Sequence, residues 1–183
     1  MNDTQIAEVT SAIIGRLRSG SKNEEWIRGG RGERTQVITR VLTELGQDFG
    51  YTVASAGSWA WLFDVVWLDY EVFDRERLLR RLVLVAESEL STGILAIRVD
   101  FNKLLVARAS LSLMIFQTDR PYRDTQYNIS YYVDLFQQSL DTIQPAFDGR
   151  LLCAGYDNQR EEFEFYELRD GQLVSVYDDF LPA

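Results

Sequence analysis

Three acidic side chains stand where the surrounding sequence is strongly apolar. Glu87 and Glu89 close the apolar run 82–86, and Asp64 lies within the aromatic and aliphatic run 61–67. Burying a carboxylate without a partner costs several kcal/mol. Each of these acids therefore needs a cation, a proton or water, and that need is the main functional clue in the sequence.

The spacing of the two glutamates puts them on one surface. Residues 82–89 are apolar and partly β-branched, which predicts a strand buried on both faces. Side chains alternate along a strand, so Val83, Val85, Glu87 and Glu89 are predicted to share a face. Two residues span about 7 Å along a strand, and both carboxylates would lie at the edge of the core.

Length and composition favour one globular domain. The chain has 183 residues, of which 46% are hydrophobic and 13% aromatic, enough to bury a core. We divide the single domain, 1–183, into an N-terminal helix with a Gly-rich linker (1–32), a core (33–116), and a helix with a β-rich C-terminal segment (117–183).

Several classes of site and location are disfavoured by composition. The chain has no His and one cysteine, Cys153, which excludes His-based triads, intrachain disulfides and ordinary structural zinc sites. Cys153 is expected to be a buried thiol. We expect a cytoplasmic protein with no membrane span, since no apolar run approaches 20 residues and the N-terminus lacks signal-peptide features.

The net charge of -9 argues against tight, nonspecific DNA binding. A local stripe of basic residues remains compatible with this net charge. The cluster Arg75, Arg77, Arg80 and Arg81 could contact phosphates, but the neighbouring acids favour a solvated face.

The elements follow from periodicity and turn residues. We expect helices at 4–18, 33–49, 69–81, 101–109 and 127–143, with Asp100 as the N-cap of the fourth and Pro145 after the fifth. We expect strands at 51–56, 59–68, 82–89, 111–116, 151–156, 162–169 and 173–177, with a hairpin turn at Asp170 and Gly171. The segments 28–32, 91–97 and 119–126 are predicted to be linker or loop. These elements predict an α/β fold with a mixed central sheet flanked by helices, including a right-handed parallel crossover.

The order of acids and elements resembles the PD-(D/E)XK nuclease superfamily, which has the restriction-endonuclease-like fold. An acid late in one strand, a Glu-X-Glu at the end of the next strand and a following helix and strand carry the resemblance, over about half the chain. It implies that Asp64 corresponds to the motif Asp and Glu87 to the motif Asp/Glu. Glu89 replaces the usual lysine, as in the Glu-X-Glu variant of some restriction enzymes.

The resemblance further implies a magnesium- or manganese-dependent nuclease acting on DNA. Asp64 and Glu87 would be metal ligands, joined by Glu44 from the preceding helix. Glu89 could be a further ligand or could orient the attacking water. Lys103, on the following helix, would take the role of the displaced lysine. A cation of this kind prefers oxygen ligands and keeps several waters, so no His is required.

Other interpretations of the same residues remain open. Asp64 could be a buried acid paired with a basic residue, and the two glutamates could lie in solvent at a sheet edge. Lys103 and Glu44 could be ordinary surface residues. The protein would then be a non-catalytic member of the fold that binds or regulates another protein, or a purely structural module. A second copy of the chain, in a homodimer, is a further expected partner.

Overall fold

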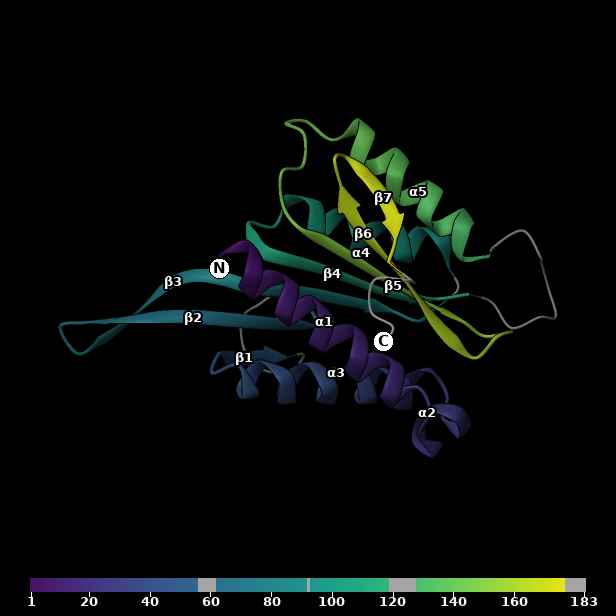
Figure 1. Cartoon of the computed structure of the whole chain (residues 1–183), viewed down its shortest axis with the longest axis horizontal. Helices are drawn as coiled ribbons and strands as arrows, with labels where there is room; N and C mark the ends of the chain where they lie inside the picture. Colours follow the sequence, from purple (N-terminus) through teal and green to yellow (C-terminus); the bar gives the residue numbers. More distant parts are fainter. Residues whose placement is uncertain (56–61, 92, 119–127, 177–183) are drawn as a thin grey trace.

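The helices and strands form one layered α/β domain. The structure is a computed structural model and describes residues 1–55, 62–91, 93–118 and 128–176. Within these residues seven strands form one mixed sheet, and helices cover both of its faces (Figure 1). The predicted α/β class, with a mixed sheet flanked by helices, is confirmed.

The element bounds are as follows. The helices are α1 (Asp3–Gly20), α2 (Glu24–Arg28), α3 (Arg31–Asp48), α4 (Ile94–Val106) and α5 (Ile129–Thr142). The strands are β1 (Thr52–Ser55), β2 (Val65–Phe73), β3 (Glu76–Glu89), β4 (Ala109–Gln117), β5 (Leu151–Asp157), β6 (Glu162–Arg169) and β7 (Gln172–Ser175).

The strands lie in the sheet in the order in which they occur in the chain. The first three form an antiparallel meander. α4 then carries the chain to β4, which is parallel to β3, and α5 carries it to β5, parallel to β4. β6 and β7 add antiparallel hairpins. The C-terminal strands therefore extend the central sheet.

Each face of the sheet has its own hydrophobic core. α1, α2 and α3 supply Ile13, Trp26 and Leu42 to one core, together with the inward side chains of that face. α4 and α5 supply Phe101 and Phe136 to the other. The alternating strand side chains divide between the two cores, which is why the central strands are apolar on both faces.

The predicted surface helix at 69–81 is wrong. β2 continues to Phe73, and β3 begins at Glu76. A two-residue turn at Asp74 and Arg75 joins them, with φ of 47° and 70°. The hairpin projects beyond the body of the domain (Figure 1). Its charged and aliphatic side chains imitate an amphipathic helix, and neither turn residue is the glycine that usually marks such a turn.

Two other boundaries are corrected. The predicted loop at 91–97 contains the first turn of α4, because Ile97 is buried in the core against the sheet. Asp100 consequently lies inside α4 and is not its N-cap. The predicted linker at 28–32 reduces to Gly29 and Gly30, between α2 and α3.

The face predicted for β3 is right except at Val83. Val85 packs in the core under α4 and α5, whereas Val83 and Leu84 both pack in the opposite core. The register of β2 and β3 shifts beside Trp67 and Leu68, and such a bulge breaks the alternation of side chains.

Several further predictions can be compared with the structure. Asp170 and Gly171 both have positive φ in the turn between β6 and β7, which confirms that hairpin. Cys153 is a buried free thiol, as expected, and burial raises its pKa. The predicted loop 119–126 and the start of the second strand, 59–61, lie outside the described residues. In the described part of the chain no helix has the length and apolar character that a bilayer span requires.

Candidate functional site

Asp64 immediately precedes β2, and Glu87 lies near the end of the adjacent strand β3. The strand predicted for 59–68 begins at Val65 within the described residues, so Asp64 lies outside it. Val65 pairs with Ala86 in antiparallel register, which brings Asp64 beside the end of β3, where its carboxylate acts on Glu87. Glu87 also pairs with Met114 of β4, which lies in the core under α4 and α5. Glu87 therefore faces α4.

Glu87 is buried, and α4 supplies its counter-ion. Its side chain is 2% exposed, and Nζ of Lys103 lies 2.5 Å from its Oε1. The ammonium of Lys103 therefore forms a close, charge-assisted ion pair with the buried carboxylate.

Asp100 completes this group from one turn earlier on α4. Its Oδ1 lies 2.8 Å from Nζ of Lys103. The i,i+3 spacing places both side chains on one side of the helix. Lys103 is thus held between the carboxylates of Glu87 and Asp100, and is itself partly exposed.

The charges of this group shift its pKa values. Burial raises the pKa of Glu87 to about 7, the neighbouring Asp64 and Asp100 carboxylates add to the rise, and Lys103 opposes it. Burial alone would lower the pKa of Lys103, but the carboxylates of Asp100 and Glu87 outweigh it and raise that pKa. Glu87 therefore gains or loses a proton near neutral pH.

The other two predicted acids do not meet Lys103. Glu89 shares the face of Glu87, but its Oε1 accepts a hydrogen bond from the Ser91 backbone N–H at 2.6 Å, which fastens the connection to α4. Glu44 is exposed on α3, whose buried residues belong to the opposite core. The expectation that Glu44 joins the metal site is therefore wrong, because the sheet separates Glu44 from Glu87.

The structure adds two residues that sequence reasoning did not assign to the site. Ser88 donates hydrogen bonds to Oδ2 of Asp64 from its backbone N–H at 2.8 Å and its hydroxyl at 3.0 Å. Asp100 was expected as a helix cap. The spacing of Asp100 and Lys103 was the available signal, but it required the helix to begin seven residues earlier than predicted.

Whether the group fits a cation depends on its oxygens. Carboxylate oxygens are the ligands that Mg²⁺ prefers, and Mg²⁺ commonly binds through one or two carboxylates while waters and phosphate oxygens complete its shell. Oε1 of Glu87 is buried and holds the ammonium of Lys103, so a metal cation at this carboxylate would take the place of that ammonium, with Asp64 nearby. Among the described residues no group of three or more His, Cys, Asp or Glu could hold a metal ion. The arrangement fits a two-carboxylate site only.

Comparison with known proteins leaves the family open. Neither a protein-family model nor a curated protein matches the chain. Among solved structures, the chain is similar to the central domain of yeast acetyl-CoA carboxylase, with 9% sequence identity and a TM-score of 0.41. The match covers 94% of this chain and 33% of that chain. A likeness this distant carries no functional argument.

Proposed function

We propose that the protein is a magnesium- or manganese-dependent nuclease that hydrolyses phosphodiester bonds in DNA. The observation that carries the proposal is the group formed by Glu87 on β3, Asp64 just before β2, and Lys103, with its Nζ 2.5 Å from Glu87. The order of elements from α3 to β4, an antiparallel meander followed by a helix and a parallel strand, supports a restriction-endonuclease-like fold.

Each side chain has a distinct part in this proposal. Asp64 and Glu87 would hold the cation, which would polarise the phosphate and lower the pKa of a bound water. Lys103, released by Glu87 and still held by Asp100, would stabilise the negative charge that develops on the phosphate. Ser88 keeps Asp64 in place through its two hydrogen bonds. Oε2 of Glu89, which has no hydrogen bond among the described residues, would orient the attacking water.

Nicking of a supercoiled plasmid in Mg²⁺ or Mn²⁺ tests the proposal. We expect the wild type to convert supercoiled DNA to open circles, and Glu87→Gln and Lys103→Met each to slow this about 10²-fold or more, as the loss of a transition-state contact does. Glu44→Gln is the matched control, since it removes an exposed carboxylate on the far face. Equal loss in this control, or metal-independent nicking, would contradict the proposal.

One observation favours a second function, that of a non-catalytic protein-binding module. Glu87 is already paired with Lys103, Asp64 with Ser88, and Glu89 with Ser91, so the acids are largely satisfied within the fold. With a net charge of -9, such a protein would bind a basic partner more readily than DNA. Absence of nicking, together with retained folding of the wild type, would favour this second function.

A further inference from the structure

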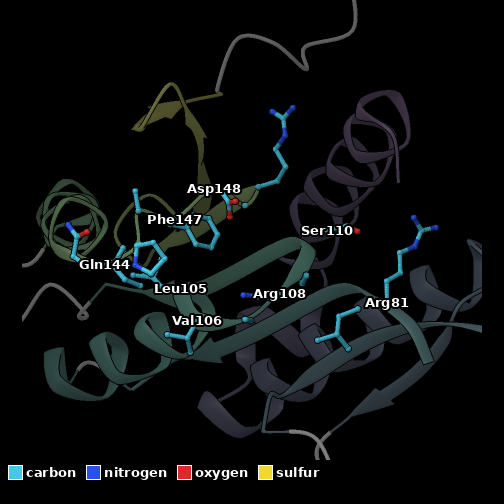
Figure 2. Close-up of a pocket in the computed structure, with 16 residues that line it drawn as sticks. Arg81, Leu105, Val106, Arg108, Ser110, Gln144, Phe147 and Asp148 are labelled. Atoms are coloured by element: carbon cyan, nitrogen blue, oxygen red, sulfur yellow. The ribbon is translucent and has the colours of Figure 1, made fainter. Parts of the chain in front are cut away.

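A cavity opens at the end of the sheet away from Glu87. It has a volume of about 860 Å³ and lies where β4 and β5 begin (Figure 2). Ala109, which lines the cavity, is five residues before Met114, the partner of Glu87, or about 16 Å along the strand. Its volume lies within the range of small-molecule sites. The cavity is therefore separate from the acidic group described above.

Two segments supply apolar walls to the cavity. Leu105 and Val106 come from the last turn of α4, and Phe147 comes from the segment between α5 and β5 (Figure 2). Val106 is 75% exposed, although it is a large aliphatic residue. An exposed aliphatic side chain and a half-buried aromatic ring that line one cavity provide apolar surface for part of a ligand.

The charges around the cavity differ in sign from the rest of the chain. Arg81, Arg108 and Arg150 line it against the single carboxylate of Asp148, whereas the whole chain has a net charge of -9. A concentration of guanidinium groups in an acidic protein creates a local potential that attracts anions.

One of the three arginines has its charge available. Nε of Arg81 lies 2.9 Å from Asp69, and Nη2 of Arg150 lies 2.8 Å from Asp3. Arg108 is exposed and has no ion pair within the described residues. Its guanidinium therefore keeps a full set of donors for a planar anion.

We propose that this cavity binds a small organic anion, a carboxylate or a phosphate monoester with an apolar body. Arg108 holds the charged group, and Val106 and Phe147 contact the apolar part. Paired donors on a guanidinium suit both carboxylate and phosphate oxygens, so the shared chemistry is an anionic head on an apolar tail.

Calorimetric titration with four probes tests this inference. The probes are octanoate, octyl phosphate, octylammonium and inorganic phosphate. We expect at least one of the two anionic amphiphiles to bind at least tenfold more tightly than octylammonium or inorganic phosphate. Backbone amide NMR shifts on binding should concentrate at residues 105–110 and 143–150. Binding of octanoate alone identifies a carboxylate ligand, and binding of octyl phosphate alone identifies a phosphate ligand.

Two variants locate the binding. Arg108→Gln should weaken the binding of the amphiphile about tenfold or more. Arg28→Gln, which changes an exposed arginine on α2, should leave the affinity unchanged. Val106→Glu places a negative charge on an exposed wall position and should weaken it without affecting folding. If Arg108→Gln lowers thermal stability but leaves affinity unchanged, Arg108 only balances the dipole of the α4 C-terminus, and the inference fails. Equal binding of octylammonium and octanoate would also overturn it.

Discussion

The ion pair with Lys103 does not fully offset the free-energy cost of burying the Glu87 carboxylate. Its carboxylate is almost inaccessible to water, and Lys103, which is partly exposed, is its one ion-pair partner among the described residues. The folded protein therefore holds a proton on Glu87 to higher pH than the unfolded chain does, with a pKa of about 7 against an ordinary value of 4.5.

This shift predicts how Glu87 affects stability. Between pH 4.5 and 7 the folded state binds more protons than the unfolded state, so Glu87 costs stability as pH rises through this window. We expect Glu87→Gln, measured with a chelator present, to gain stability relative to wild type by about 1–2 kcal/mol between pH 5 and pH 8. Urea denaturation at the two pH values measures this difference.

Glu25→Gln serves as the control for that series. Arg40 lowers the pKa of Glu25, so this carboxyl is ionised at both pH 5 and pH 8. No gain with rising pH is expected for the control. A similar gain in both variants would mean that burial of Glu87 is not the cause.

The turn between β2 and β3 could not be recognised from its sequence. Arg75 has a φ of 70°, a conformation that costs a residue with a Cβ roughly 1–2 kcal/mol. Residues 69–73 extend the strand that begins at Val65, but the charged residues and the absence of a glycine concealed the turn. The hairpin at Asp170 and Gly171 was predictable because it has the residues that such turns prefer.

Arg75→Gly is therefore expected to stabilise the protein by about 0.5–1 kcal/mol, since glycine adopts positive φ without strain. Glu76→Gly, one residue later in β3, where no positive φ is required, should destabilise it instead. Thermal unfolding of both variants distinguishes the two signs. Destabilisation by Arg75→Gly would contradict the turn described here.

The approach of α3 to the sheet depends on Gly46. A Cβ at this position would lie 2.5 Å from Cγ2 of Val53 and 2.7 Å from Nε1 of Trp67. The indole of Trp67 donates a hydrogen bond to the Leu42 carbonyl at 2.9 Å, so its ring cannot move away without breaking that contact.

Gly46→Ala should consequently cost about 2–3 kcal/mol of stability, as overpacking in a close-packed core does. Gly15→Ala is its matched control. Gly15 also lies within a helix, but a Cβ there would meet nothing within 4 Å, and alanine should stabilise that helix by about 0.5–1 kcal/mol. The two glycines are predicted to differ in the sign of the change in the free energy of unfolding.

At the scale of the whole molecule, the sequence predicts the sheet and its two helical layers better than it predicts the site. Apolar runs and hairpin residues identify most strands, because burial on both faces leaves a strong signal. These patterns could not place Glu44, because long-range packing decides which face of the sheet α3 covers. The association of Asp100 with Lys103 depended on where α4 begins, and Gly93 provides no side-chain cap to mark it.

The molecule also separates two regions of opposite charge. Carboxylates gather beside the carboxyl end of β3, and guanidinium groups gather at the cavity where β4 begins. The two regions lie at opposite ends of the same parallel strands. The cation site and the anion site proposed here can therefore be tested independently, because a variant at one is remote from the other.

The central claim is that Asp64 and Glu87 together hold a divalent cation. Its most direct test is calorimetric titration of Mn²⁺ into the wild type, Asp64→Asn, Glu87→Ala and the control Glu44→Gln. We predict binding at millimolar metal in the wild type and in Glu44→Gln, and its loss in both of the other variants. Binding that survives in Asp64→Asn and Glu87→Ala, or no binding in the wild type, would contradict the claim.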